Sequence, residues 1–309
     1  MYNLTMPKPI IGTTIVEKLT NKVLKPMVKE IKHKNTRLKK LAVIITQDTP
    51  EIHTYVAAKK QFFKNLGLPF QIFNTADDFS LVQDVIYTLN NAPEIAGILL
   101  QLPLADTLQH KQTELINLIA PHKDVEGLTA QNLGLLSQGK ISIMSPVVEG
   151  MFWALRSLNI AWDSKFWYIM GAGTLVGKPL SIYLASKKVS FVLADKNNPQ
   201  YDLIKYADII VTGTGQDLKD VILKNKSIEF KPGAIILDAG TRYKNNHIHS
   251  DLDLPEDPAM FTEKQDVLIK LEKISYYTPA RKSLGPLTVF SLAYNFLHLQ
   301  LTQDNTSGI

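Results

Sequence analysis

A short apolar run, residues 167–170, leads directly into a turn that contains Gly171, Gly173 and Gly177, and a helical pattern follows the turn. This order predicts a strand, a tight turn and a helix, whose backbone amides and N-terminus can hold a pyrophosphate. Gly177 falls one position late for the dinucleotide-binding fingerprint, and a chain with 16 glycines produces loose spacings of this kind by chance. The nucleotide-binding hypothesis therefore depends on the segments around the turn.

The segment that follows this predicted helix supports the hypothesis. Asp195 ends the next apolar run about 20 residues downstream, where a carboxylate would accept hydrogen bonds from the ribose hydroxyls of an adenosine. The alternative is that Asp195 is a turn former, because residues 196–199 are Lys-Asn-Asn-Pro. Since a carboxylate would repel a ribose phosphate, the ribose role favours NAD over NADP as the cofactor.

Apolar runs alternate with helical patterns along the whole chain, which is typical of an α/β fold with parallel sheets covered on both faces. The predicted strands are residues 41–45, 70–73, 95–100, 167–170, 190–194, 208–212 and 234–238. The predicted helices are residues 14–34 with a bend at Pro26, then 50–66, 81–90, 108–119, 151–158, a helix that ends near 186, and 286–301. The periodicity fades over residues 124–143, which indicates a domain junction, and the tail after Thr302 is predicted to fray.

The composition is that of a globular protein, with 45% hydrophobic and 20% charged residues, and 309 residues suffice for two domains. No apolar run approaches the roughly 20 residues that a transmembrane helix needs, and no secretion leader is evident, so we expect a cytoplasmic protein without a membrane role. The absence of cysteine excludes disulfides, thiolate metal sites and cysteine nucleophiles.

Much of the net charge of +5 lies between Lys22 and Lys40, where no aromatic residues alternate with the lysines. We interpret this run as a solvated helix face and expect no nucleic-acid binding.

Polar residues stand out at three places in the first half. Tyr55 and Lys59 are four apart on a predicted helix, so both side chains leave one face, although Tyr201 and Lys205 repeat that spacing in a segment where we expect a surface turn. Gln101 ends a predicted strand and points into the crevice of a parallel sheet, or else is satisfied at the strand edge. Asp124 lies in the predicted junction, where an aspartate near a glycine often caps a turn.

Together these segments resemble the bifunctional methylenetetrahydrofolate dehydrogenase/cyclohydrolase family. The resemblance is collinear and covers nearly the whole chain. It rests on residues 41–44, Tyr55-Val56-Ala57-Ala58-Lys59, residues 97–104, Lys123-Asp124-Val125-Glu126-Gly127-Leu128 with Asn132 and Gly134, Val176-Gly177-Lys178-Pro179, residues 232–240, Thr278-Pro279 and Gly285-Pro286-Leu287-Thr288.

The resemblance implies two α/β domains flanking a cleft, the second a Rossmann-like nucleotide-binding domain. It implies a catalytic folate-binding domain over residues 1–145, an NAD(P)-binding domain over 146–284, and a C-terminal helix over 285–309 that returns to the first domain. It also implies a homodimer formed through the nucleotide-binding half. The two reactions are hydride transfer from methylenetetrahydrofolate to a nicotinamide cofactor and hydrolysis of the methenyl product to the formyl form, in one-carbon metabolism that serves purine biosynthesis.

By the same resemblance, Lys59 is the catalytic lysine, Tyr55 stacks on or orients the folate, Gln101 tunes the lysine and Asp124 anchors the pterin. An amine that moves protons near neutral pH needs a lowered pKa, which a partly desolvated cleft provides, and no metal is required. Pro279 is a further expected substrate contact. The expected cofactor-binding residues are Gly171, Ala172, Gly173, Thr174, Leu175, Val176, Asp195, Thr214, Gly215, Gly240 and Thr241.

Several positions depart from the family pattern. Ala172 replaces an arginine suited to a ribose phosphate, and Asp195 replaces a serine, so we expect NAD as the cofactor with NADP possible. Residues 280–284, Ala-Arg-Lys-Ser-Leu, replace a segment with two glycines, which commonly supply close backbone approach or positive φ. A proline-cysteine-threonine-proline is lost near residues 144–150, and Ile52 replaces a serine.

Two alternatives to the bifunctional enzyme therefore stay open: a cyclohydrolase without dehydrogenase activity, and a non-catalytic folate- or nucleotide-binding paralogue. In an alternative interpretation, Arg281 and Lys282 bind the glutamate tail of folate.

Overall fold

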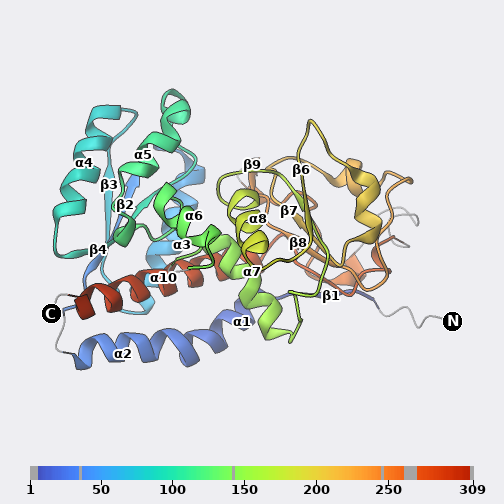
Figure 1. The fold of residues 1–309 in the computed structure, drawn as a ribbon, viewed down its shortest axis with the longest axis horizontal. Helices are drawn as coiled ribbons and strands as arrows, with labels where there is room; N and C mark the ends of the chain where they lie inside the picture. Colours follow the sequence, from blue (N-terminus) through green and yellow to red (C-terminus); the bar gives the residue numbers. More distant parts are fainter. Residues whose placement is uncertain (1–5, 35–36, 141–142, 245–246, 261–269, 307–309) are drawn as a thin grey trace. The chain divides into compact units, whose positions relative to one another are not determined.

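The computed structural model describes residues 6–34, 37–140, 143–244, 247–260 and 270–306 (Figure 1). Its contacts divide the chain into two compact units. The lysine unit, which contains Lys59, comprises Glu17–Leu136, Lys140–Pro146 and the chain from Val289 on. The nucleotide unit, which contains the glycine-rich turn, comprises the chain up to Val16, Ser137–Gly139 and Val147–Thr288.

The lysine unit is built on a parallel three-stranded sheet with the order β3-β2-β4. Its strands are β2 (Lys40–Ile45), β3 (Phe70–Asn74) and β4 (Ile95–Leu100), and Leu41 is the register partner of both Phe70 and Gly97. Every residue of β4 is buried, as a continuous apolar run predicts for a parallel strand that is covered on both faces. The remaining elements are α3 (Pro50–Asn65), α4 (Phe79–Asn91), η2 (Asp106–Lys111), α5 (Gln112–Leu118), η3 (Pro121–Lys123) and α6 (Ala130–Ser137).

Helix α3 carries Tyr55 and Lys59, and local sequence explains where it begins. Thr49 is extended and its side chain accepts a hydrogen bond from the amide of Ile52 at 3.4 Å, while Pro50 occupies the first turn, where no amide hydrogen is needed. The predicted helix over 50–66 is therefore confirmed to within one residue. Helix α6 lies within residues 124–143, where the fading periodicity indicated no helix, and the domain junction placed there stays a prediction.

The nucleotide unit contains a parallel six-stranded sheet with the order β1-β11-β8-β7-β5-β6. The strands are β1 (Lys8–Pro9), β5 (Trp167–Met170), β6 (Phe191–Ala194), β7 (Ile209–Thr212), β8 (Ile235–Asp238) and β11 (Tyr276–Tyr277). The other elements are α7 (Pro146–Ser157), α8 (Gly177–Ser186), η4 (Tyr201–Tyr206), η5 (Lys219–Leu223), the hairpin β9 (Arg242–Lys244) and β10 (His247–His249), and η6 (Pro258–Met260). Strands β5 to β8 lie within one residue of their predicted bounds.

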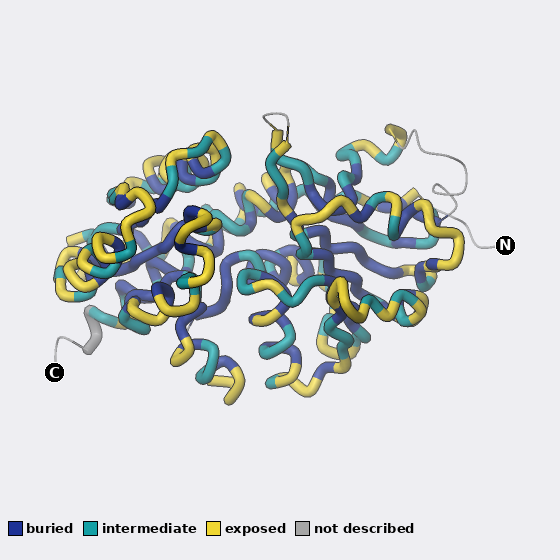
Figure 2. Tube along the Cα trace, turned by 90° about the horizontal axis from the view of Figure 1, so that it is seen from above, coloured by how far each residue is buried: buried dark blue, intermediate teal, exposed yellow. Residues whose placement is uncertain are grey.

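Almost every residue of β2, β4, β5, β7 and β8 is buried, and Figure 2 shows buried, dark blue stretches of the trace. In the nucleotide unit the side chains of Tyr168, Ile210 and Ile236 project from neighbouring strands into one buried cluster, which Phe230 completes. The α/β fold with parallel sheets, predicted from the alternation of apolar runs and helices, is confirmed. None of the helices within the described residues combines the length and apolarity needed to cross a membrane.

Two helical segments continue from one unit into the other. Residues 12–33 form α1 (Gly12–Leu19), a π-helical turn η1 (Thr20–Leu24) and α2 (Lys25–His33). The irregularity predicted at Pro26 thus lies in the turn before it, because proline cannot donate a hydrogen bond to the preceding turn and that turn widens.

The second such segment is α10 (Leu284–Thr306), which includes the predicted helix 286–301. The prediction that the chain frays after Thr302 is wrong for residues 303–306, which continue the helix. Within the lysine unit Phe296 packs against Phe63 with ring centroids 5.5 Å apart, and Asn295 donates to the carbonyls of Val125 and Met144 at 2.9 and 2.8 Å. The predicted return of the C-terminal helix to the first α/β domain is confirmed. The exact domain boundaries stay predictions, although β1 pairs with β11 and so joins the nucleotide sheet.

Candidate active site

Lys59 and Gln101, predicted from separate segments, are brought together in the lysine unit. The Lys59 Nζ donates a hydrogen bond to the Gln101 Oε1 at 2.5 Å. Gln101 follows β4, is buried, and its backbone amide donates to the Ile44 carbonyl at 2.9 Å, which fixes it at the carboxyl edge of the sheet. Its Nε2 donates to the Leu102 carbonyl at 2.6 Å, so the amide is oriented with its oxygen toward the lysine.

Glu126 is a site residue that our sequence reasoning missed. Its charge interacts with that of Lys59, and both side chains are only partly exposed. Burial raises the pKa of the Glu126 carboxyl to about 7, the Lys59 ammonium opposes that rise, and the Asp124 carboxylate adds to it. Burial also lowers the pKa of Lys59, against the attraction of Glu126. The available signal was a second carboxylate, two residues after Asp124 and directly before Gly127.

Asp124 accepts four hydrogen bonds within its own turn. Its Oδ1 accepts from the amides of Glu126 and Gly127 at 3.1 and 2.9 Å, and its Oδ2 accepts from the amide of Thr129 and the Nδ2 of Asn132, both at 2.9 Å. The side chain is 2% exposed. The geometry therefore agrees with the turn-capping alternative, and Asp124 holds the backbone that carries Glu126.

Tyr55 lies one turn before Lys59 on α3 and is half-buried. The spacing places both side chains on the same face of the helix, as predicted. Its stacking against a folate stays a prediction.

The glycine-rich turn follows β5 and leads into α8, as predicted. Gly171 has φ +102°, and a Cβ on Gly177 would lie 1.8 Å from the Gly171 carbonyl oxygen, so both positions need glycine. A Cβ on Gly173 would have a single neighbour within 4 Å, at 3.8 Å, so the turn has open space on that side. Ala172, Thr174, Leu175 and Val176 complete the turn before the helix begins. An open glycine turn at a helix N-terminus fits the phosphates of a dinucleotide.

Asp195 directly follows β6 and is exposed. The Gly171 amide donates to the Ala194 carbonyl at 2.8 Å, so the residue before Asp195 lies beside the glycine turn. The Asp195 Oδ1 also accepts from the amides of Asn197 and Asn198 at 2.8 and 3.1 Å. Asp195 therefore forms the predicted turn, and its role in binding a ribose stays a prediction.

The other expected cofactor residues lie at the same carboxyl edge of the sheet. Thr214 and Gly215 follow β7, while Gly240 and Thr241 follow β8. A Cβ on Gly215, whose φ is +66°, would lie 3.4 Å from the Thr241 carbonyl oxygen, so these two loops meet. Pro279 follows β11 and is buried, and its carbonyl accepts from the Ser283 Oγ at 2.5 Å.

The altered segment 280–284 has a defined conformation. Lys282 has φ +57°, so a lysine occupies the left-handed backbone region that glycine favours. Its Nζ pairs with Glu256 at 2.9 Å, and the Ala280 amide donates to the Leu254 carbonyl at 2.9 Å. The backbone of this segment packs closely against Gly12, because a Cβ on Gly12 would lie 1.8 Å from the Ser283 carbonyl oxygen. The glycine that this close packing requires is therefore Gly12 and not a residue of the segment itself.

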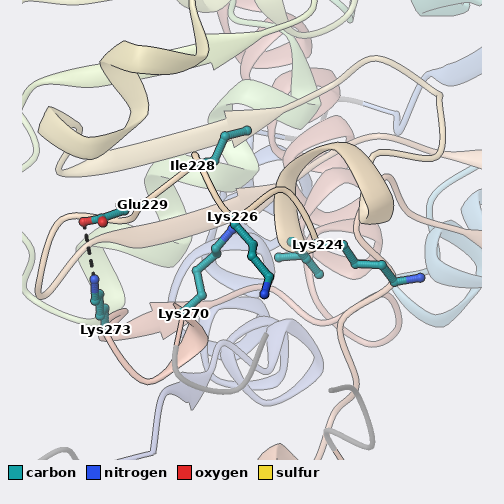
Figure 3. A pocket seen from close by; sticks show the side chains of 7 residues that line it. Lys224, Lys226, Ile228, Glu229, Lys270 and Lys273 are labelled. Carbon is teal, nitrogen blue, oxygen red and sulfur yellow. Dashed lines mark ion pairs between the residues drawn. The ribbon is translucent and has the colours of Figure 1, made fainter. Parts of the chain in front are cut away.

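A separate cavity of about 240 Å³ in the nucleotide unit has a cationic lining (Figure 3). Lys273 pairs with Glu229 there at 3.5 Å, and the Lys270 Nζ donates to the carbonyls of Ile222 and Asn225. None of the predicted site residues lines this cavity. Within the described ranges no cluster of three histidine, aspartate or glutamate side chains is suited to a metal ion.

Comparisons with known proteins match two family models to this chain, one before and one after residues 127–144. A family model described as the tetrahydrofolate dehydrogenase/cyclohydrolase catalytic domain matches residues 10–126, and one described as the NAD(P)-binding domain of the same enzymes matches residues 145–304.

The relatives cover nearly the same length. The bifunctional protein FolD of Lactobacillus delbrueckii subsp. bulgaricus is 32% identical over 267 residues, which are 85% of this chain and 87% of that protein. A methylenetetrahydrofolate dehydrogenase from the silkworm Bombyx mori has the same fold, with a TM-score of 0.82 and 24% identity over 97% of this chain and all of the other. The FolD of Campylobacter jejuni matches with a TM-score of 0.81 and 24% identity over 96% of this chain and 99% of its own.

Proposed function

Because this chain belongs to the tetrahydrofolate dehydrogenase/cyclohydrolase family, we propose that it oxidises methylenetetrahydrofolate with a nicotinamide cofactor and hydrolyses the methenyl product to the formyl form. The observation that carries the proposal is the hydrogen bond between Lys59 and Gln101, with Glu126 interacting with the same lysine. Burial lowers the pKa of Lys59, which makes its amine a better proton acceptor nearer neutral pH, and the Glu126 carboxyl, with a pKa of about 7, interacts electrostatically with it.

For the hydrolysis, the neutral amine of Lys59 accepts a proton from the water that adds to the methenyl carbon. The Lys59 ammonium then returns that proton to the folate nitrogen whose bond to the carbon breaks. As this bond breaks, the hydroxyl group of the adduct loses its proton to solvent and becomes the formyl C=O, so that the formyl group stays on the other nitrogen. Gln101 holds the Lys59 side chain in one orientation. A fixed geometry of this kind can increase a reaction rate by several orders of magnitude. Tyr55, on the same helical face, orients the folate.

We assign the pterin-binding carboxyl to Glu126 rather than to Asp124. The four hydrogen bonds that Asp124 accepts within its turn occupy both oxygens, whereas Glu126 lies within electrostatic reach of the lysine. A carboxyl that is protonated near neutral pH can donate to a ring nitrogen, and in its ionised form it can accept from an amino group. Asp124 keeps a role as the residue that shapes this turn.

For the oxidation, a nicotinamide cofactor accepts the hydride when it is bound. The glycine turn and the N-terminus of α8 would hold its phosphates, and Asp195 its adenosine ribose. Asp195 and the lack of a cation at Ala172 support NAD rather than NADP as the preferred form. Thr214, Gly215, Gly240 and Thr241 would line the remainder of the nucleotide site, and Pro279 would contact the substrate.

The proposal is tested by two separate assays on the purified chain. Methylenetetrahydrofolate is supplied with NAD or with NADP, and methenyltetrahydrofolate hydrolysis is followed without any nucleotide. Lys59→Ala should abolish the hydrolysis, while Lys60→Ala, the neighbouring exposed lysine on α3, should not. If neither activity exceeds the buffer rate, or if Lys59→Ala behaves as Lys60→Ala, the enzymatic proposal is wrong.

A cyclohydrolase without dehydrogenase activity is the second candidate. The observation that favours it is the altered segment, in which a lysine, Lys282, and not a glycine has a positive φ. Hydrolysis without oxidation by either cofactor would identify this case, and absence of both with retained ligand binding would identify a non-catalytic paralogue. A cytoplasmic homodimer stays a prediction, and sedimentation of the purified chain tests the dimer.

A further inference from the structure

Asp251 holds both ends of the nucleotide loop, which we define as residues 213–218, the segment after β7. The Asp251 Oδ2 accepts from the Thr214 amide and the Thr214 Oγ1, both at 2.8 Å. The Asp251 backbone carbonyl accepts from the Leu218 amide at 2.9 Å. Asp251 itself is fully buried, with 0% of its surface exposed. One residue therefore fixes a loop that lies more than thirty positions away in the sequence.

The same carboxyl group also shapes the loop after β8. A Cβ on Gly240 would lie 1.9 Å from the Asp251 Oδ1 and 2.4 Å from its Oδ2. The carboxyl group thus fills the space beside the Cα of Gly240, and no larger residue fits there. Thr214 and Gly240, two of the expected cofactor residues, are placed by one side chain.

Asp251 is in turn anchored to the ends of two strands. Asp238, the last residue of β8, accepts from the Asp251 amide at 3.1 Å and from the Leu252 amide at 2.8 Å. Thr212, the last residue of β7, donates to the same Asp238 carboxyl at 2.8 Å. All four residues are buried, so the position of Asp251 is set by the rigid edge of the sheet rather than by solvent-exposed loops.

We propose that Asp251 is a positioning residue for the nicotinamide cofactor, which sets the backbone of Thr214 and Gly240 before the cofactor arrives. The proposal rests on the proposed nucleotide site at the carboxyl edge of this sheet. A loop held in its binding conformation loses little conformational entropy when the ligand binds, so the contribution of Asp251 appears in cofactor affinity. It does not appear in the hydrolytic step, which requires Lys59 and no nucleotide.

The test compares Asp251→Ala, Asp251→Asn and Asp208→Ala in the full-length chain. Asp208 precedes β7, so it lies at the opposite end of the same strand, where it accepts from the Phe166 amide and pairs with Lys231 at 2.7 Å. Its removal should therefore lower stability without touching the nucleotide loop. Calorimetric binding of NAD and of NADP, the melting temperature and methenyl hydrolysis without nucleotide are measured for each variant.

We expect Asp251→Ala to weaken cofactor binding by about tenfold or more, while hydrolysis stays within about twofold of wild type. Asp251→Asn should recover most of the affinity, because its amide oxygen can accept from Thr214. The Asp251 Oδ1 has no hydrogen-bond partner among the described residues, although the backbone amides of Gly215 and Gln216 favour the charged form of the carboxyl group. Hydrogen exchange of the Thr214 amide should accelerate in Asp251→Ala and not in Asp251→Asn.

Asp251→Ser, whose hydroxyl is too short to reach Thr214, replaces the alanine variant if that one does not fold, and the same loss is expected. The proposal is overturned if the variant that lacks the carboxyl group binds the cofactor as tightly as wild type. It is also overturned if Asp208→Ala reduces cofactor affinity by the same amount. A wild-type chain that binds neither NAD nor NADP would instead refute the proposed dehydrogenase function. The two failures are therefore distinguishable.

Discussion

The Lys59 Nζ lies 2.5 Å from the Gln101 Oε1, although the two residues come from a helix and a strand end that are 42 positions apart. The glutamine cannot turn freely, because its Nε2 donates to the adjacent Leu102 carbonyl. The direction of the lysine is thereby set by the carboxyl edge of a buried parallel sheet.

Gln101→Leu should slow methenyl hydrolysis by about 10- to 100-fold, because leucine has a similar volume and cannot accept from Lys59. The matched control is Gln109→Leu, which removes an exposed glutamine that donates to the Leu104 carbonyl at 2.6 Å in the same unit. Initial rates and melting temperatures are compared. Equal rates for the two variants would mean that Gln101 does not orient the lysine.

Glu126→Gln should shift the pH dependence of hydrolysis to lower pH. The Glu126 carboxylate raises the pKa of Lys59 against the effect of burial, so removing that charge lets the pKa of the lysine fall further. The neutral amine that accepts a proton then exists at more acidic pH, and the limb of kcat/KM that requires it moves in the same direction. Glu114→Gln, which removes a carboxylate paired with Lys111 on the surface, should leave the profile unchanged. A shift toward alkaline pH would contradict the assignment.

Ala172→Arg combined with Asp195→Ser should change the ratio of kcat/KM for NADP over NAD by at least about tenfold in favour of NADP. The reason is that a cation suited to a ribose phosphate is added and a repelling carboxylate is removed. Asp195→Asn separates the two roles of Asp195, because an asparagine keeps the acceptor for the amides of Asn197 and Asn198 but carries no charge. Asp202→Ser, at an exposed aspartate on η4, is the control. A preference for NADP in the wild type would refute our interpretation of both positions.

Lys282→Gly should stabilise the protein by roughly 1 kcal/mol, since it relieves the cost of a side chain in the left-handed region. The loss of the exposed pair with Glu256 offsets this by less than about 1 kcal/mol. Arg281→Gly, at the preceding exposed position, should instead destabilise by roughly 0.5–1 kcal/mol through backbone entropy. Urea unfolding gives both free energies. A Lys282→Gly variant that loses as much stability as Arg281→Gly would show that the altered segment carries no backbone strain.

Local patterns predicted most of the fold because the burial of a segment is visible in its own residues. The apolar run of β4 specified a strand buried on both faces, and the predicted start of α3 near residue 50 agrees with the structure. The π-helical turn before Pro26 was missed because it does not interrupt the apolar period of the predicted helix. Helix α6 was missed because its residues show no clear apolar period. The end of α10 was also misjudged, because polar residues at a helix end do not by themselves stop the helix.

The amino-acid sequence by itself determined the parallel sheets, the glycine turn after β5 and the placement of Tyr55 and Lys59 on one helical face. Each of these follows from residues within a few positions of one another. Only the tertiary structure decided that Glu126 interacts with Lys59 while Asp124 caps its own turn, and that Asp251 lies against Gly240. These relationships join segments that meet only when strand register and packing are set, and two carboxylates two residues apart are indistinguishable until those constraints place one at the lysine and the other on the backbone.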